Sequence, residues 1–162
     1  MNEIIGVISD THDNIPNIEC AVDIFNQYQV SLVIHCGDFI APFALVAFKD
    51  LKCPLIGVFG NCDGEQDFLL HRAQELKYSI YHPPYTSEIS DKKILISHKP
   101  VIPDNNFDII IYGHTHKPQI SIQKNQKPYL IINPGEASGW LFHKATIAIM
   151  DLKTITAQLI PL

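Results

Sequence analysis

Short, uninterrupted hydrophobic runs recur along the chain, and each stops at a small polar cluster. In the first half these runs are residues 4–8, 32–36 and 55–59. A continuous apolar run of this length is typical of a strand buried on both faces of a parallel sheet. Between the runs, apolar residues at helical spacing predict helices from Pro16, over 42–48 and over 66–76. The alternation predicts βαβ units and a parallel sheet.

The second half of the chain consists mostly of predicted strands. Its apolar runs are residues 94–96, 109–112, 129–132, 145–150 and 155–160. The polar segment 151–154 between the last two runs predicts a hairpin turn. We therefore expect an α/β fold of two packed mixed sheets with helices on the outside. The 162 residues match the usual size of one domain, so we expect a single domain over 1–162.

Asp, Asn and His side chains follow five of the predicted strands. These candidate site residues are Asp10 and His12, Asp38, Asn61, His98, and His114 and His116. Ligands of open α/β sheets bind beyond the carboxyl ends of the strands, so these side chains are expected to meet at one rim. Carboxylate, amide and imidazole donors without thiolates suit Mn, Fe, Co, Ni or Zn ions. The pattern predicts a metal site.

The local spacing of the candidate ligands points the same way. Asp10 and His12 are two residues apart, as are His114 and His116. In an extended segment such pairs point to the same side, which would direct both side chains at one place. Glycines 37, 60 and 113 each precede a candidate ligand, and glycine permits the tight turn that an inward-facing side chain would need.

Composition and charge narrow the function classes. The chain is 46% hydrophobic and 18% charged, which is typical of a globular protein and excludes disorder. A net charge of −5 argues against an extended nucleic-acid surface. No apolar run approaches the roughly 18 residues of a membrane span. The four cysteines form no Cys-x-x-Cys pair and the first residues lack a basic leader, so we expect reduced thiols and a cytoplasmic location.

Taken in order, these motifs resemble those of the calcineurin-like metallophosphoesterase superfamily. The motifs are Asp10-x-His12, Gly37-Asp38, Gly60-Asn61-x-Asp63, His98 and Gly113-His114-x-His116. The short chain and its Gly-Asn-Cys-Asp variant are similar to the small, single-domain YfcE-like phosphodiesterase branch. The resemblance extends from residue 4 to about residue 139. It implies a four-layer α/β sandwich with a dinuclear metal site at the strand ends.

The resemblance also implies roles for individual residues. One ion would be held by Asp10, His12, Asp38 and His116. The other would be held by Asp38, Asn61, His98 and His114, with Asp38 as the bridge. Manganese is the first expectation for both divalent ions, and nickel, iron, cobalt and zinc are alternatives. A hydroxide bridging the two ions would attack phosphorus in line and hydrolyse a small phosphodiester, since paired ions ionise water and clamp the attacking and leaving oxygens.

Three positions depart from the family pattern. Cys62 stands where many relatives have a histidine thought to protonate the leaving group, so we include Cys62 with Asp38 and Asn61 as catalytic candidates. Lys99 follows His98 in place of the usual glycine, where it either faces the phosphate or points to solvent. Glu136 replaces a serine common in relatives and would place a carboxylate near the rim, unfavourable to an anionic substrate.

Two other functions remain open. A branch of the same fold, similar to the Vps29 subunit of a trafficking complex, is a protein-interaction scaffold with a degraded metal site. A phosphomonoesterase is the third reading. The complete ligand set favours the phosphodiesterase. His35 fits either packing or orientation of a ligand, and Asp63 fits either support of a metal-bound histidine or a turn. Trp140 and Phe142 fit packing or a subunit contact, which leaves a homo-oligomer open.

Overall fold

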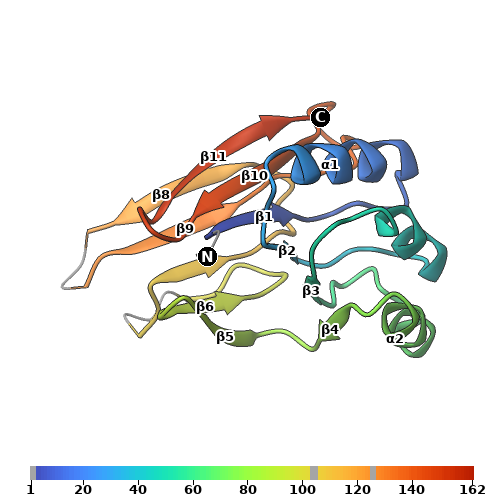
Figure 1. The fold of residues 1–162 in the computed structure, drawn as a ribbon, viewed down its shortest axis with the longest axis horizontal. Helices are drawn as coiled ribbons and strands as arrows, with labels where there is room; N and C mark the ends of the chain where they lie inside the picture. The colour runs from blue at the N-terminus through green and yellow to red at the C-terminus, as the bar shows by residue number, and fades with distance from the viewer. Residues whose placement is uncertain (1–2, 103–105, 125–126) are drawn as a thin grey trace.

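Two mixed β-sheets packed face to face form the framework of this computed structural model, which describes residues 3–102, 106–124 and 127–162 (Figure 1). The strand order is β11-β10-β1-β2-β3-β4 in one sheet and β5-β6-β7-β9-β8 in the other. The elements are β1 (Ile4–Ile8), α1 (Ile15–Gln27), β2 (Leu32–His35), the 3₁₀ helix η1 (Pro42–Phe48), β3 (Leu55–Val58), α2 (Gln66–Glu75), β4 (Ser79–Tyr81), β5 (Tyr85–Ile89), β6 (Lys92–Ile96), β7 (Ile109–Ile111), β8 (Gln119–Gln123), β9 (Tyr129–Asn133), β10 (Thr146–Asp151) and β11 (Thr156–Pro161).

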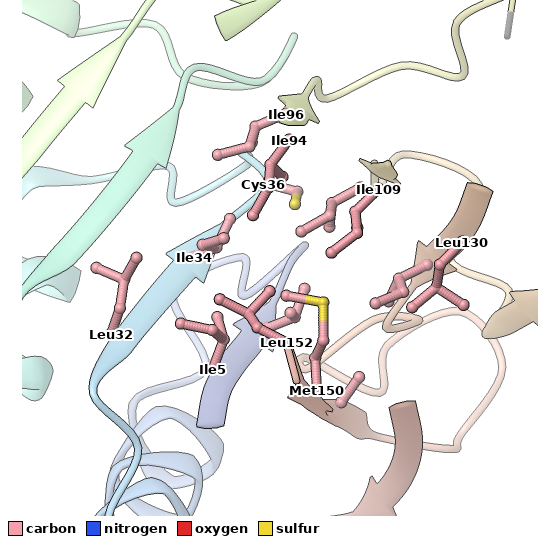
Figure 2. Close-up of a cluster of buried hydrophobic side chains, with 14 of the residues drawn as sticks. Ile5, Leu32, Ile34, Cys36, Ile94, Ile96, Ile109, Leu130, Met150 and Leu152 are labelled. Atoms are coloured by element: carbon pink, nitrogen blue, oxygen red, sulfur yellow. The ribbon is translucent and has the colours of Figure 1, made fainter. Parts of the chain in front are cut away.

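The main core lies between the two sheets. Strand β1 is parallel to β2, which is parallel to β3, and all three are covered on both faces. Ile5 and Ile34 point towards the second sheet, where they meet Ile94 and Ile109 (Figure 2). Ile8, on the same strand as Ile5, packs under the helices instead. Burial on both faces explains why these strands are continuous apolar runs in the sequence.

Helices cover the outer face of the six-stranded sheet. The buried residues of α1 are Ile18, Ala21, Val22 and Phe25. Helix α1 lies so close to the sheet that a Cβ atom at Gly6 would be 2.5 Å from the Phe25 ring. The side chain of Asn14 caps α1 by accepting a hydrogen bond from the N–H of Asn17. No helix in the described ranges is long and apolar enough to cross a membrane.

The five-stranded sheet has a different outer cover. Leu95, Ile110 and Ile131 point away from the main core and pack against Val101 and Phe107. Within the described residues, Val101 and Phe107 cover this outer face, and no helix lies on it. The expected mixed α/β sandwich with two packed sheets is confirmed, and the described helices all lie on the six-stranded side.

Three strands were not predicted from the sequence. Strands β4 and β8 lie at sheet edges, and β5 is the edge strand opposite β8. Edge strands bury only part of their side chains, so their sequences alternate or stay polar and give no continuous apolar run. The predicted short helix over 42–48 is a 3₁₀ helix.

The carboxyl ends of five strands bring the polar clusters to one end of the sandwich. Strands β1, β2 and β3 are mutually parallel in their sheet, and β6 and β7 are parallel in the other. Cross-sheet contacts join the two groups of loops, because the N–H of His114 donates to Asp10 and Asn61 Oδ1 lies 2.9 Å from His98 Nε2. The rim expected from the strand ends is therefore present.

Candidate metal centre

Four of the predicted ligands converge closely. Donor atoms of Asp10, His12, Asp38 and His116 all lie within 4.8 Å of one another. Asp10 and Asp38 are buried, and the two imidazoles close the group from the more open side. This is the same set that the family resemblance assigns to one ion.

Asp10 and Asp38 each use one carboxylate oxygen to hold a loop and direct the other oxygen at the donor group. Oδ2 of Asp10 accepts hydrogen bonds from Ser9 Oγ at 2.6 Å and from the N–H of His114 at 3.0 Å. Oδ1 of Asp38 accepts from the N–H of Cys62 at 2.8 Å. Oδ2 of Asp38 lies 3.5 Å from His12 Nε2 and also 3.5 Å from His98 Nε2. One oxygen of Asp38 is therefore placed between two groups of donors.

Two histidines have their tautomers fixed by acceptors behind them. His98 Nδ1 lies 2.8 Å from the carbonyl oxygen of Cys36, and His116 Nδ1 lies 2.8 Å from Oε2 of Glu136. A carbonyl or carboxylate oxygen can only accept, so both Nδ1 atoms carry the proton. The Nε2 lone pairs of these rings then face the rim, which is the usual arrangement of a metal-binding histidine.

A second group of donors adjoins the first. Nε2 of His98 lies 2.9 Å from Oδ1 of Asn61 and 3.3 Å from Nδ1 of His114. With the Nδ1 proton of His98 directed at Cys36, the Nε2 lone pair faces the amide oxygen. Two such acceptors repel unless a cation or a proton lies between them. Together with Asp38, these residues are the set assigned to the other ion.

Unsatisfied buried atoms mark the same place. Among the described residues, the buried side-chain nitrogen and oxygen atoms without a hydrogen-bond partner are Oδ1 of Asp10 and Nε2 of His12. Leaving such atoms unpaired is costly in a protein interior. Both belong to the four-residue group. The orphaned atoms and the oxygen and imidazole chemistry of the donors fit a divalent transition ion.

The backbone at these ligands is left-handed, not extended. The φ angles are 53° at Asp10, 40° at His12, 60° at Asp38, 64° at His114 and 59° at His116. The expectation that the two-residue spacing acts through an extended segment was therefore wrong. The pairs converge because each side chain leaves a tight turn, and residues held at positive φ are a recurrent feature of functional sites.

The glycines beside the ligands serve two different purposes. Gly37 has a φ of +94°, which provides the turn expected from the sequence. Gly60 and Gly113 are required for space instead. A Cβ atom at Gly60 would overlap the Asp38 carboxylate, and one at Gly113 would overlap Ser9 Oγ. Both glycines allow the loops of neighbouring strands to lie directly on the candidate ligands.

Asp63 organises the loops rather than a histidine. Its Oδ2 accepts from the N–H groups of Gly60 at 2.7 Å and Asp38 at 3.1 Å, and its Oδ1 accepts from that of Ile40 at 2.8 Å. Burial raises the pKa of Asp63 above its ordinary value, against the opposing effect of these hydrogen bonds. The side chain connects the turn after β3 to the turn after β2.

His35 is a packed histidine beneath the site. Its ring is fully buried and stacks on Phe39 with centroids 3.6 Å apart. Nδ1 accepts from the N–H of Gly37, and Nε2 lies 3.1 Å from Thr11 Oγ1. Burial lowers the pKa of His35 well below its usual value, so the ring is neutral. It supports the turns that carry the ligands.

Glu136 does not face the rim, contrary to the expectation. Its side chain is buried and accepts from His116 Nδ1, from the N–H of Phe142 at 2.6 Å and from the N–H of Leu141 at 3.0 Å. Burial raises the pKa of Glu136, but these hydrogen bonds outweigh it and the net pKa lies below the usual range. The sequence carries no signal for this role, because the partners are one distant histidine, two backbone N–H groups and the hydroxyl of Ser138.

Cys62 and Lys99 lie at the edge of the site. Cys62 is exposed, and its Sγ accepts a hydrogen bond from Asn61 Nδ2 at 3.2 Å. Desolvation and the nearby Asp38 carboxylate raise the pKa of the thiol to about 11, which makes it a weak acid at neutral pH. Lys99 lines a surface hollow together with Asn61 and His98.

Two hollows open on the donor groups from different sides, and Asn61 lines both. We call them the Lys99 hollow and the Trp140 hollow. The Lys99 hollow, of about 400 Å³, is lined by Phe59, Gly60, Asn61, Gln66, His82, Pro83, Pro84, Ser97, His98 and Lys99. The Trp140 hollow, of about 380 Å³, is lined by His12, Asp38, Asn61, Cys62, His114, Thr115, His116, Trp140, Leu141 and Phe142.

Comparisons with known proteins show what the chain is similar to. The sequence model of the calcineurin-like phosphoesterase superfamily domain matches residues 4–155. Phosphodiesterase MJ0936 of Methanocaldococcus jannaschii is 38% identical over 155 residues, covering 91% of this chain and 92% of the relative. Phosphodiesterase YfcE of Escherichia coli is 24% identical over 149 residues, covering 80% and 77%. A solved structure of an archaeal phosphodiesterase has a TM-score of 0.88 at 35% identity and covers 98% of this chain and 99% of that one.

Vps29 proteins share the architecture at lower similarity. A Vps29 mutant from Entamoeba histolytica has a TM-score of 0.67 at 18% identity, covering 98% of this chain and 99% of that one. At that identity the likeness shows the fold alone.

Proposed function

Because this chain belongs to the calcineurin-like phosphoesterase superfamily, we propose that it is a metal-dependent phosphodiesterase with two divalent ions at the rim. Manganese is the first candidate, with nickel, iron, cobalt and zinc as alternatives. The activity belongs to one domain over residues 1–162. The observation that carries the proposal is Oδ2 of Asp38, which lies 3.5 Å from a histidine nitrogen of each donor group.

The donor groups divide between the two ions. Asp10, His12, Asp38 and His116 hold one ion, and Asp38, Asn61, His98 and His114 hold the other. When bound, such an ion pair supplies hydroxide at neutral pH and positive charge for an anionic phosphate. Two carboxylates balance only part of the four positive charges, so the rim attracts a phosphate ester.

Protein groups then position the ester. Asn61 binds through its carbonyl oxygen, so its amide N–H₂ stays free for a phosphate oxygen as well as for Cys62 Sγ. The exposed thiol of Cys62 lies beside Asn61 and is the candidate proton donor for the leaving oxygen. Lys99 adds a cation on the side of the Lys99 hollow.

The two hollows favour a diester over a monoester. A phosphate bound beside Asn61 would direct one ester substituent into the Lys99 hollow and the other into the Trp140 hollow. A monoester would fill one hollow and leave the other open. A phosphomonoesterase is therefore the second candidate.

The complete donor set supports an enzyme over a protein-interaction scaffold. A scaffold has no use for buried, unpaired atoms such as Oδ1 of Asp10 and Nε2 of His12, which lower stability without a ligand. Convergent donors with their rear atoms fixed by hydrogen bonds serve ion binding.

Hydrolysis of bis(p-nitrophenyl) phosphate tests the proposal directly. We expect turnover with added Mn²⁺, loss of activity with a chelator, and loss of at least about a hundredfold in Asp38→Asn, comparable to the removal of a group that stabilises the transition state. Asp23→Asn, an exposed change on α1, serves as the matched control. Full activity in Asp38→Asn would exclude the bridging role, and no turnover with any divalent ion would favour the scaffold.

A further inference from the structure

Three consecutive large hydrophobic side chains stand exposed beside the candidate ion site. We call Trp140, Leu141 and Phe142 the apolar wall; their side chains are 59%, 63% and 45% exposed. No other run of three exposed large hydrophobic residues occurs in the part of the chain that the structure describes. Isolated exposed hydrophobic residues are ordinary, but a contiguous patch marks a binding surface.

The apolar wall is hydrogen-bonded to residues of the candidate site. The indole N–H of Trp140 donates to the carbonyl oxygen of His12 at 3.2 Å. The N–H groups of Leu141 and Phe142 donate to the buried Glu136 carboxylate. Glu136 in turn accepts from His116. The indole of Trp140 and the backbone of Leu141 and Phe142 are therefore held in place beside the site, which lowers the entropy cost of ordering this segment on binding.

The apolar wall and the ion donors enclose one space. The Trp140 hollow is lined by His12, Asp38 and His116 together with the apolar wall. An ester bound at the donors would extend its substituent along the wall. Lys117 also places its Nζ 5.5 Å from the centre of the Phe142 ring, so the wall is apolar with a cation at its edge.

We propose that the apolar wall is the subsite for a planar aromatic substituent of the phosphodiester, such as an aryl group or a nucleobase. The inference rests on the proposed function and adds the class of substrate. Indole and phenyl rings stack on the flat face of an aryl group or of any nucleobase, so this contact does not depend on the identity of the base. The apolar wall lines the same hollow as the ion donors, so the substituent of a bound ester reaches it directly, and the Lys117 cation at its edge adds attraction for an anionic ester.

Binding of two phosphonates that cannot be hydrolysed tests the subsite. Phenylphosphonate and methylphosphonate share the anionic head and differ in the ring. We expect calorimetry on the Mn²⁺-loaded protein to give a dissociation constant at least about fivefold lower for phenylphosphonate, the fold-change of a weak base–aromatic stack. The double change Leu141→Ala with Phe142→Ala should reduce this preference to about twofold or less, and Phe68→Ala, an exposed aromatic on α2, should keep it.

The choice of variants keeps the outcome clear. Leu141 and Phe142 anchor Glu136 through backbone groups, so alanine retains those hydrogen bonds, whereas changing Trp140 would release the carbonyl of His12. An equal affinity of both phosphonates for the unmodified protein, or a preference kept in the double variant, would overturn the subsite. So would light scattering that shows a dimer converted to a monomer by the double variant, because the wall would then be an interface. A phenyl preference without any diester hydrolysis would instead reject the proposed function.

Discussion

Oε2 of Glu136 lies 2.8 Å from Nδ1 of His116, while Oε1 of the same carboxylate accepts from the N–H of Phe142. One buried side chain therefore connects a candidate metal ligand to the segment that forms the apolar wall. The carboxylate fixes the ring so that Nε2 faces Asp10, 3.3 Å from its Oδ1. The position of the wall and the orientation of His116 depend on the same group.

The change Glu136→Gln should weaken ion binding. A glutamine keeps the size and one acceptor oxygen but loses the charge opposite His116. Outer partners of metal-binding histidines typically contribute 10–100-fold to affinity, so we expect about that loss in Mn²⁺ affinity by calorimetry. Glu88→Gln, on the exposed strand β5, provides the control. An unchanged Mn²⁺ affinity in Glu136→Gln would mean that His116 needs no support.

The change Cys62→His should shift the balance between ester classes. The imidazole would restore a proton donor beside Asn61, and monoesters depend on leaving-group protonation more than activated diesters do. General acid catalysis contributes 10²–10⁴-fold, so we expect the monoester-to-diester ratio of kcat/KM to rise at least about tenfold. The measurement uses phenyl phosphate, whose leaving group is poor, and bis(p-nitrophenyl) phosphate, with Cys20→His as the control. A constant ratio would remove Cys62 from the mechanism.

The change Asp63→Ala should destabilise the protein. Three backbone N–H groups, of Asp38, Ile40 and Gly60, would lose their acceptor in a largely buried turn. Each unsatisfied buried donor costs about 1–3 kcal/mol, and water can replace part of the loss, so we expect about 2–4 kcal/mol. Urea unfolding measures the difference, and Asp23→Ala should stay within about 0.5 kcal/mol. A loss below about 1 kcal/mol in Asp63→Ala would show that the loops hold without it.

Added Mn²⁺ should stabilise the fold. An ion that binds only the native state at a hundred times its dissociation constant adds about 2.7 kcal/mol, which is a rise in Tm of about 5–10 °C for a domain of this size. Thermal unfolding with and without Mn²⁺ measures the shift. In His12→Ala the shift should fall by more than half, whereas the exposed His71→Ala should retain it. Equal shifts in both variants would place the ion elsewhere.

Much of the framework follows from simple sequence patterns. Strands β1 and β7 are continuous apolar runs because both faces are covered, and that burial makes them easy to recognise. Polar residues after such strands were expected to meet at one rim, and the structure places Asp10, Asp38 and His98 together there. The edge strand β8, with alternating Gln and Ile, carried no comparable signal.

The local geometry of the site could not be predicted from the sequence to the same extent. The left-handed turns at His12 and His114 are accompanied by hydrogen bonds to loops of other strands, which a local sequence pattern does not reveal. The same holds for Glu136, whose role depends on backbone N–H groups that every residue except proline has. Residue types at strand ends predicted which groups meet, and only the folded loops determine how each side chain is held.

The positive φ angles at the five candidate ligands have a consequence for which substitutions the rim can accept. Asp, Asn, His and above all Gly tolerate this conformation better than other residues. A replacement of His12 or His114 by glycine would relax the turn while discarding an ion donor. At these two positions backbone relaxation and ion binding therefore favour different residues. Glycine at Asp10 or Asp38 would in addition remove the acceptor that holds a neighbouring loop, so those two turns depend on their carboxylates.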